Sequence, residues 1–204
     1  MDSFLSENCT FSALGKLSSA YRDSFSCGHD DIDDFFKNDF QSYSEQMLGK
    51  SYCFYSDTVE NQIVCAFTIS NDSIKVHLLP NARKKNVAKA LPYEKRHLKT
   101  FPAVLIGRLG VNTELKNKGI GHELMDFIKA WFVNPNNKTG CRFIVVDSYN
   151  EEKPLSFYSK NGFKFLFSTE AQEIEYMGLP ENSILDTRLM YFDLIILNSD
   201  EPNI

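Results

Sequence analysis

The residues best suited to chemistry include a short loop with two glycines, Lys116-Asn117-Lys118-Gly119-Ile120-Gly121. Glycines carry no Cβ atom, so a ligand can come close to the backbone there. The loop precedes a segment of helical periodicity, and the first N–H groups of a helix have no partner inside the helix. Such amides lie at the positive end of the helix dipole and bind anions. The loop therefore predicts a cradle for a pyrophosphate group.

A plainer interpretation of Gly119 and Gly121 is that they only ease a tight loop. Two common nucleotide-binding patterns fit this stretch poorly. The dinucleotide fingerprint needs a third glycine at a set distance, which is missing here, and the P-loop places its lysine after the last glycine. In this sequence Lys118 precedes the glycine. The phosphate cradle and the tight turn both stay open at this point.

The second stretch that could do chemistry is Phe157-Tyr158-Ser159-Lys160-Asn161-Gly162-Phe163. A phenol has a pKa of about 10, so at pH 7 it holds its proton. A positioned tyrosine can therefore serve as a general acid. The alternative is that Tyr158 is an aromatic core residue, like Phe157 and Phe163.

A strand and a helix are expected to position the loop. Ala103–Leu109 is apolar except for Arg108, which predicts an interior strand covered on both faces. After the loop, apolar residues recur at helical spacing and form one face, made of Ile120, Leu124, Phe127, Ile128 and Trp131. The loop should therefore connect the strand exit to the helix start. Gly110 is expected to mark a bulge or a close backbone approach at the strand end.

The N-terminal part predicts one helix and three strands. Asp30 or Asp31 can cap the helix, and Gly49 suits its C-terminal stop. The apolar positions of this helix are Ile32, Phe35, Phe36, Phe40, Tyr43 and Met47. The strands are expected at Phe11–Leu17, Ser51–Tyr55 and Gln62–Ile69, with the last two joined as a hairpin.

The C-terminal part predicts a further helix and three more strands. The helix Pro154–Lys160 begins with a proline, whose missing N–H costs nothing in the first turn, and ends at Asn161-Gly162. Residues 170–184 are expected to form a loop with a short helical turn, and residues 199–204 a frayed tail. The strands are expected at Arg142–Asp147, Phe163–Phe167 and Thr187–Leu197.

This order of elements predicts an α/β (α+β) fold. The strand–helix–strand unit in the middle of the chain is parallel by the crossover rule. It should lie in a mixed, mostly antiparallel sheet with helices on both faces. A length of 204 residues suits a single domain with one sizeable core.

The composition, with 24% charged and 43% hydrophobic residues, is ordinary for a globular protein. No apolar run approaches the ~20 residues that a membrane span needs, and the N-terminus lacks the pattern of a secretion signal. A cytoplasmic location without a membrane partner is therefore expected. The cysteines include no Cys-x-x-Cys pair, so we expect reduced thiols and no metal site; they are Cys9, Cys27, Cys53, Cys65 and Cys141.

Residues 71–100 contain a basic cluster, made of Arg83, Lys84, Lys85, Lys89, Lys95, Arg96 and Lys99. A run of this kind is usually a solvated face or a mobile loop. The functional alternative is a patch for a polyanion such as an RNA backbone. The net charge of −5 argues against nucleic acid binding through the whole surface. It leaves a local basic patch open.

The glycine loop resembles the acyl-coenzyme A loop of the Gcn5-related N-acetyltransferases, Arg/Gln-x-x-Gly-x-Gly/Ala. It departs from that pattern only at Lys116, where the family usually has arginine or glutamine. The tyrosine segment is similar to a second motif of the same family, Phe/Leu-Tyr-x-x-x-Gly-Phe. One helix, one strand and one loop separate the two motifs, as the family requires. The resemblance covers about residues 10–198 and implies a single N-acetyltransferase domain, residues 1–204, with that family's fold.

This resemblance implies an enzyme that moves an acetyl group from acetyl-CoA, its co-substrate, to a primary amine by direct attack, without a metal. Tyr158 would be the general acid to the leaving thiolate. Leu109, Gly110 and Val111 would offer a backbone N–H to the thioester carbonyl, because amides aimed at an oxyanion stabilise it strongly. Asn150 would form a hydrogen bond with the pantetheine arm. The other coenzyme-binding residues would act through their backbone amides; they are Lys116, Asn117, Lys118, Gly119, Ile120, Gly121 and His122.

Two details qualify that set. Asn150 lies one residue further from the tyrosine than the family's asparagine usually does. No general base can be named, since Glu114 and Asp147 near strand ends are ordinary carboxylates by their context. An amine of low pKa, such as an aminoacyl ester, needs no protein base.

A narrower resemblance concerns Phe25-x-Cys27-Gly28-x-x-x-Ile32-Asp33-x-Phe35-Phe36 and Gly107-Arg108-Leu109-Gly110-Val111. These segments look like the acetyltransferase toxins of bacterial toxin–antitoxin pairs, which acetylate the α-amino group of aminoacyl-tRNA. This would make the acceptor an aminoacyl-tRNA instead of a small-molecule amine, and it would imply an antitoxin partner, with a homodimer as a further assembly. The acidic balance speaks against RNA. A non-catalytic acyl-CoA-binding module and a partner-binding domain are the hypotheses from other classes.

Overall fold

The computed structural model describes residues 3–88 and 98–197 of the chain. These residues form two compact units. The first unit holds the chain up to Ser70 together with Ile106–Ala130, and the second holds Asn71–Leu105 and the chain from Trp131 on. Two strands, β3 (Ile63–Lys75) and β4 (Thr100–Val111), contribute residues to both units.

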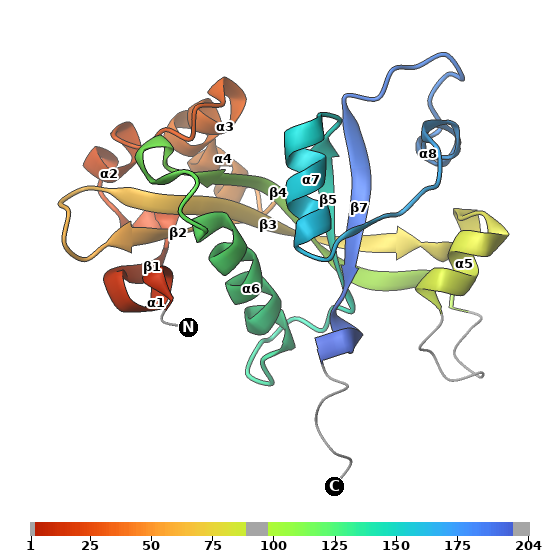
Figure 1. Ribbon diagram of the computed structural model, residues 1–204, viewed down its shortest axis with the longest axis horizontal. Coiled ribbons are helices and arrows are strands. Elements are labelled where there is room, and N and C mark those ends of the chain that lie inside the picture. The colour runs from red at the N-terminus through yellow and green to blue at the C-terminus, as the bar shows by residue number, and fades with distance from the viewer. Residues whose placement is uncertain (1–2, 89–97, 198–204) are drawn as a thin grey trace, which may run out of the picture. The chain divides into compact units, whose positions relative to one another are not determined.

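The strands of the described residues form a seven-stranded mixed sheet in the order β1-β2-β3-β4-β5-β7-β6 (Figure 1). The other strands are β1 (Cys9–Ala13), β2 (Lys50–Ser56), β5 (Phe143–Tyr149), β6 (Lys164–Phe165) and β7 (Thr187–Asp193). β2 pairs antiparallel with β1 and β3, and β7 pairs antiparallel with β5 and β6. β4 and β5 are the parallel pair, connected through helix α6 (Ile120–Val133). The predicted mixed sheet with a central parallel β-α-β unit is confirmed.

Within the first unit, helices cover both faces of the sheet. Phe127 of α6 packs against Phe11 of β1 and Phe54 of β2, with 4.8 Å between ring centroids in each pair. On the other face, Tyr21 of α2 (Ser19–Asp23) contacts Tyr55, at 5.5 Å between centroids. Phe54 and Tyr55 are neighbours in one strand, so their side chains point to opposite faces. The remaining helical segments of this unit are α1 (Phe4–Asn8), η1 (Leu14–Lys16), α3 (Asp30–Asp34), η2 (Phe35–Asp39), α4 (Phe40–Glu45) and η5 (Thr113–Leu115).

The helix predicted to start at Asp30 or Asp31 is present, but it is interrupted by a π-helical turn, η2, between α3 and α4. Its N-cap residue is His29, which makes no side-chain cap bond. The predicted stop at Gly49 is wrong, because Met47 takes the left-handed conformation (φ 58°) after α4. Gly49 is needed for packing instead, since a Cβ there would lie 2.5 Å from the Tyr43 ring.

The second unit has its own hydrophobic core. Its helical segments are η3 (Val76–Leu78), α5 (Asn81–Val87), α7 (Glu152–Lys160), α8 (Glu170–Met177) and η6 (Leu194–Leu197). The core is built from Ile74, Val76, Leu79, Val87, Phe101, Ala103, Phe143, Val145, Leu166, Phe167 and Tyr191. Tyr176 of α8 packs on Phe167, and its hydroxyl accepts the N–H of Lys75 at 3.3 Å. These contacts attach α8 to the end of β3.

Four local predictions need correction. The strand expected at Phe11–Leu17 ends at Ala13 and continues as η1, and the strand expected to reach Leu197 ends at Asp193 and continues as η6. The loop expected at 71–100 contains the end of β3, η3 and α5. The turn expected within 170–184 is the eight-residue helix α8. Lys89, Lys95 and Arg96 of the basic cluster and the tail 199–204 lie outside the described residues.

A buried ion pair connects α8 to β7. Glu173 has no exposed surface and accepts hydrogen bonds from Arg188 Nε at 2.8 Å and from the backbone N–H of Leu189. The Arg188 guanidinium also lies 3.4 Å from the Glu170 carboxylate and 5.0 Å above the Phe165 ring. A buried carboxylate needs such partners, because an unpaired buried charge is costly.

Candidate functional site

The loop between β4 and α6 holds two residues in the left-handed region, Asn117 at φ 64° and Gly119 at φ 82°. Glycine adopts this region freely, and asparagine tolerates it better than most residues. A Cβ at Gly119 would meet no heavy atom within 4 Å. The glycine therefore serves the turn of the backbone, and the space beside it is open to a ligand.

The amides of this loop divide into two groups. The N–H of Lys116 donates to Thr113 at 3.4 Å, and the N–H groups of His122 and Glu123 donate to the carbonyl of Gly119 at 2.9 and 3.2 Å. Between them, the amides of residues 117–121 have no acceptor within the described part of the chain. Helix α6 is 14 residues long, so its dipole adds to these donors. This arrangement fits an anion such as a pyrophosphate.

The lysines of the loop strengthen that fit. Lys116 and Lys118 are both exposed, and neither forms an ion pair with a described residue. The Lys116 ammonium lies beside Gly28, 3.5 Å from the position that a Cβ of that glycine would take. A second glycine-containing turn of the same unit therefore adjoins the loop.

The end of β4 is a place of close backbone approach, as predicted for Gly110. A Cβ at Gly110 would lie 2.8 Å from Cys27 Cβ and 3.2 Å from the Phe25 ring, so no other residue fits without displacement. Beyond it, Asn112 is buried, donates its side-chain N–H to the carbonyl of Ile63 at 3.0 Å, and accepts the N–H of Glu114 at 3.1 Å. These bonds fix the backbone from Leu109 to the start of the loop.

The segment around Cys27 is held in place by Asp33, which lies outside the predicted set of site residues. Asp33 accepts hydrogen bonds from the Ser26 hydroxyl at 2.6 Å and from the N–H of Cys27 at 2.7 Å. Burial alone would raise the pKa of Asp33, but the hydrogen bonds from Ser26 and Cys27 outweigh it and lower the pKa. The carboxylate thus stays ionised and clamps the turn against Gly110. In the sequence, the feature that points to this contact is the spacing between Cys27 and Asp33 in the narrower motif.

In the second unit, Tyr158 lies on α7 and is half-buried. Its ring contacts Phe157 and Phe163, with centroid distances of 5.1 and 5.4 Å. Burial raises the pKa of the Tyr158 phenol well above its usual range, so the phenol keeps its proton at neutral pH. The helix ends as predicted at Asn161-Gly162, where the N–H of Phe163 reaches back to the carbonyl of Tyr158 at 3.0 Å.

Asn150 also belongs to the second unit, where it fixes the segment that precedes β7. Its backbone N–H donates to Asp186 at 2.8 Å, and its side-chain nitrogen donates to the carbonyl of Leu185 at 3.0 Å and to Glu170 at 3.2 Å. The side-chain N–H groups are therefore engaged with the protein itself. A pantetheine contact through Asn150 stays a prediction.

Two carboxylates considered as general bases differ in their surroundings. Burial, with Asp72 and Glu173 nearby, raises the pKa of Asp147. Glu114 accepts a hydrogen bond from the Gln62 side chain at 3.1 Å. Within residues 3–88 and 98–197 we find no cluster of His, Cys, Asp and Glu that could hold a metal ion, and no helix there could cross a membrane.

Comparison with known proteins identifies a family match. The sequence model of the acetyltransferase (GNAT) domain matches residues 50–165, more than half of the chain. The matched region includes β4, the glycine loop, α6 and Tyr158.

Solved structures with the same fold match almost the whole chain. AtaT complexed with acetyl-methionyl-tRNAfMet has a TM-score of 0.64 and 18% sequence identity, over 93% of this chain and 97% of that one. A Tyr-to-Phe mutant of KacT has a TM-score of 0.63 and 18% identity, over 94% and 98%. AtaTR bound with AcCoA has a TM-score of 0.62 and 18% identity, over 95% and 99%. At this identity the likeness shows a shared fold.

Proposed function

The chain belongs to the GNAT acetyltransferase family, and from this we propose that it moves the acetyl group of acetyl-CoA to a primary amine by direct attack. In this proposal residues 1–204 are one N-acetyltransferase domain that contains both units. The observation that carries the proposal is the row of amides without acceptors, residues 117–121, in the loop that fits the family's coenzyme motif.

The coenzyme would be held mainly by the first unit. The amides of residues 117–121 would donate to its pyrophosphate, and the ammonium groups of Lys116 and Lys118 would add positive charge. The backbone of Leu109–Val111 would face the thioester, and Asn150 in the second unit would contact the pantetheine arm. The complexes of AtaTR and of AtaT with acetyl-CoA, which share this fold, support the choice of co-substrate.

The proposed reaction needs one proton donor from the protein. The amine nitrogen bonds to the thioester carbonyl carbon, the C–S bond breaks, and the sulfur leaves with the bonding electrons. Tyr158 would give its phenolic proton to that sulfur, while the amine loses a proton to solvent. The raised pKa of Tyr158 supports this role, because the phenol is protonated over the whole neutral range.

Replacing Gly121 with glutamate should abolish tight acetyl-CoA binding. The substitution puts a side chain and a negative charge next to the proposed pyrophosphate site, while an acidic residue in the first turn of a helix is favourable for the helix itself. We expect the Kd to rise at least about tenfold, which corresponds to about 1.4 kcal/mol. Isothermal titration calorimetry with acetyl-CoA measures it.

The matched control for this variant is Gly140→Glu. Gly140 is exposed, has open space around its Cα and lies outside the loop. The control adds the same charge to the chain and should bind acetyl-CoA like the parent. Unchanged affinity in Gly121→Glu would remove the loop from the coenzyme site.

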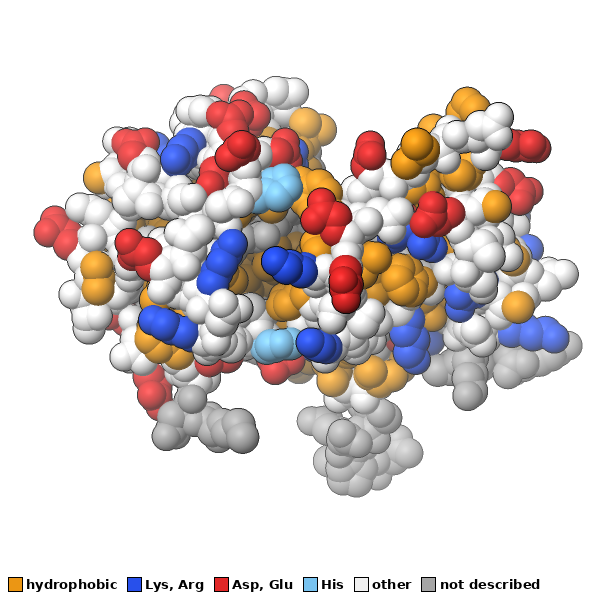
Figure 2. Space-filling view, turned by 45° about the horizontal axis from the view of Figure 1, so that its top comes forward, with side chains coloured by type: hydrophobic (Ala, Val, Ile, Leu, Met, Phe, Trp, Pro, Cys, Tyr) orange, Lys and Arg blue, Asp and Glu red, His pale blue; other side chains and the backbone are white. Residues whose placement is uncertain are grey.

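A second, more specific candidate is that the acceptor is the α-amino group of an aminoacyl-tRNA, with an antitoxin as protein partner. The observation in its favour is that AtaT, which matches this chain over nearly its full length, was solved with acetyl-methionyl-tRNAfMet, and a Tyr-to-Phe mutant of it with the C-terminus of the antitoxin AtaR. Arg83, Lys84 and Lys85 lie together on α5 and offer phosphate contacts. On the face drawn in Figure 2, however, acidic and basic side chains are interspersed.

Salt dependence of tRNA binding tests this candidate through Lys84 and Lys85. Each phosphate neutralised contributes about 0.7 to 0.9 to the slope of log affinity against log salt. If both lysines contact the tRNA, the double alanine variant should flatten the slope by about 1.4 to 1.8. Filter binding of an aminoacyl-tRNA between low and high salt measures this slope.

The control variant replaces two exposed lysines outside α5, Lys37 and Lys138, with alanine, so its net charge changes by the same amount. Its slope should stay at the parental value, and acetylation of a small amine should be unaffected in both variants. A parental slope in the Lys84/Lys85 variant would leave the small-molecule acceptor as the better candidate.

A further inference from the structure

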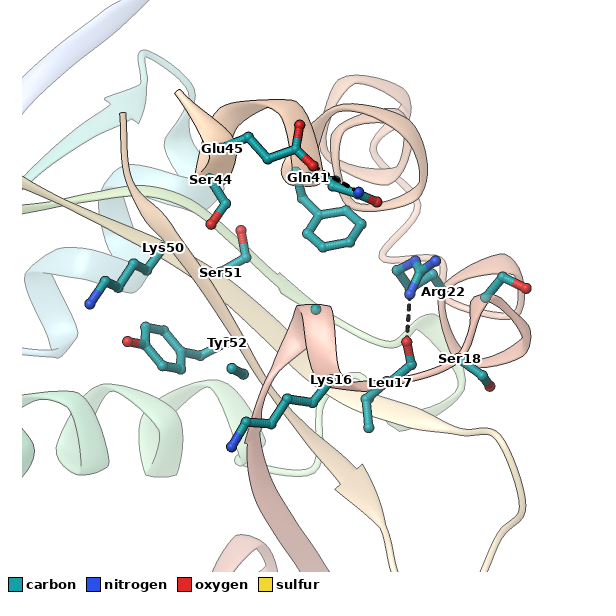
Figure 3. A pocket seen from close by; sticks show the side chains of 14 residues that line it. Lys16, Leu17, Ser18, Arg22, Gln41, Ser44, Glu45, Lys50, Ser51 and Tyr52 are labelled. Atoms are coloured by element: carbon teal, nitrogen blue, oxygen red, sulfur yellow. Dashed lines mark hydrogen bonds between the residues drawn. The ribbon is translucent and has the colours of Figure 1, made fainter. Parts of the chain in front are cut away.

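A pocket with a volume of about 710 Å³ opens in the first unit, where the start of β2 faces η1, α2 and α4 (Figure 3). Its size lies within the range of small-molecule sites. None of its lining residues belongs to β4, to the loop 116–119 or to α6. The pocket is therefore separate from the proposed coenzyme cradle.

A buried hydroxyl in this pocket has no partner. Ser51, the second residue of β2, is 7% exposed, and its Oγ makes no hydrogen bond to any described residue. Figure 3 shows the Ser51 hydroxyl pointing toward that of Ser44 on α4. Buried polar groups in proteins nearly always have a partner, and leaving one unpaired lowers stability. A bound group with a hydrogen-bonding oxygen would satisfy Ser51.

The pocket also has an excess of positive charge. Lys16 and Lys50 are exposed at its edge, and neither forms an ion pair with a described residue. Arg22 is fixed by its bond to the carbonyl of Leu17, at 2.7 Å, and by the Phe40 ring, 5.0 Å below its guanidinium. Glu45 is the acidic residue of the lining. Three cations against one anion favour a negatively charged ligand, although the whole chain carries −5.

Aromatic and apolar surface completes the lining. Leu17 and Phe40 provide the apolar wall beside Ser51, and Phe40 lies beneath the Arg22 guanidinium. The Tyr52 ring is stacked on Phe11 at 5.5 Å, on the face of the sheet opposite to Ser51. A ligand with a flat apolar body can pack on Leu17 and on the edge of Phe40, while its charged group stays near the lysines. Pockets for small molecules combine these two features, a mostly apolar wall and a few placed polar groups.

We propose that this pocket is a second binding site, for a small organic anion that carries a phosphate or carboxylate group on a ring-containing body. The anionic oxygens lie near Lys16 and Lys50 and accept a hydrogen bond from the Ser51 hydroxyl, and the ring packs on Leu17 and Phe40. Lysine is a common phosphate ligand, because its ammonium is a compact charge with three donors.

The direct test is a titration of the labelled protein followed by NMR. The probes are phenyl phosphate, benzoate and phenol, which share a ring and differ in their charged group. We expect phenyl phosphate or benzoate to shift the amide signals of Lys50, Ser51 and Tyr52, and phenol to leave them in place. The stronger of the two anions identifies the group that the site takes. Signals that stay unchanged with both anions, at millimolar probe, would overturn the proposal.

Two variants separate a ligand site from a chance concavity. Lys16→Ala combined with Lys50→Ala should weaken the anion at least fivefold, whereas Lys37→Ala, on an exposed lysine of η2 outside the pocket, should not. Ser51→Ala should leave the melting temperature of the free protein unchanged or higher, because the hydroxyl has no partner to lose, and should reduce the stabilisation by the anion. A lower melting temperature with unchanged affinity would show that water satisfies Ser51, and would contradict the proposal.

Saturation with coenzyme A distinguishes this site from the proposed function. The anion should bind equally well in the presence and absence of coenzyme A, since the two sites share no residue. Competition between them would mean that the pocket takes the coenzyme, and would overturn this proposal. If the protein binds the anion but does not bind coenzyme A, the result contradicts the proposed coenzyme cradle and leaves the second binding site supported.

Discussion

Tyr158→Phe should lose most of its turnover and keep its affinity for acetyl-CoA. Removing a general acid typically costs about 10²- to 10⁴-fold in rate. Burial makes the Tyr158 phenol a weaker acid as well as a well-protonated one, so the lower part of this range is expected here. The variant should fold normally, because phenylalanine keeps the ring contacts with Phe157 and Phe163. Release of free thiol at saturating substrate gives the turnover number.

The pH profile adds a second readout for this residue. The raised pKa means that Tyr158 loses its proton only above the ordinary tyrosine value of about 10. The parental rate should therefore rise as the acceptor amine deprotonates and should not fall again below that pH. Tyr55→Phe, at a half-buried tyrosine of the first unit that contacts Tyr21, is the control and should stay active. A Tyr158→Phe enzyme with most of its activity would make this tyrosine a packing residue.

Glu173→Ala should be the most destabilising of the substitutions considered for the second unit. It removes the buried partner of the Arg188 guanidinium, which keeps only the half-exposed Glu170 at 3.4 Å, and it removes the acceptor of the Leu189 N–H. Breaking a buried ion pair on one side typically costs about 3–5 kcal/mol. Urea unfolding followed by circular dichroism gives this loss of unfolding free energy.

Two comparisons make the Glu173 result interpretable. Glu170→Ala removes a carboxylate that is about half exposed and only 3.4 Å from Arg188, so it should cost at most about 1 kcal/mol. Replacing Glu173 and Arg188 together by leucine and methionine should cost less than Glu173→Ala alone, because no unpaired charge remains. Equal losses in all three variants would mean that the ion pair does not determine the stability of this region.

The sequence predicted the elements whose patterns are strong. The apolar run before the loop, the helical face from Ile120 onward and the hairpin of β2 and β3 are all present, because burial of those faces determines their structure. The element ends were harder to predict. Leu14 and residues 194–197 are still apolar after their strands turn into 3-10 helices, and hydrophobic pattern alone does not distinguish these conformations.

Tertiary contacts decided several details that no local pattern contains. Glycine is a common helix stop, yet after α4 the left-handed residue is Met47 and not Gly49. Gly49 is needed because a Cβ there would collide with the neighbouring Tyr43 ring. The clamp from Asp33 to Cys27 and the unpaired hydroxyl of Ser51 depend on which segments meet in space. The glycine loop was easier to predict, because the free amides of a helix start follow from local backbone geometry.

The division of the chain between its two units has a consequence for biosynthesis. The first unit needs Ile106–Ala130 beside β3, yet Asn71–Leu105, which precede them in the chain, belong to the second unit. Neither unit is a continuous stretch of sequence. During translation the N-terminal residues therefore cannot complete the first unit until the chain up to Ala130 has left the ribosome, because β4 and α6 are made later. A stop codon between β3 and β4 yields a fragment that lacks part of both units.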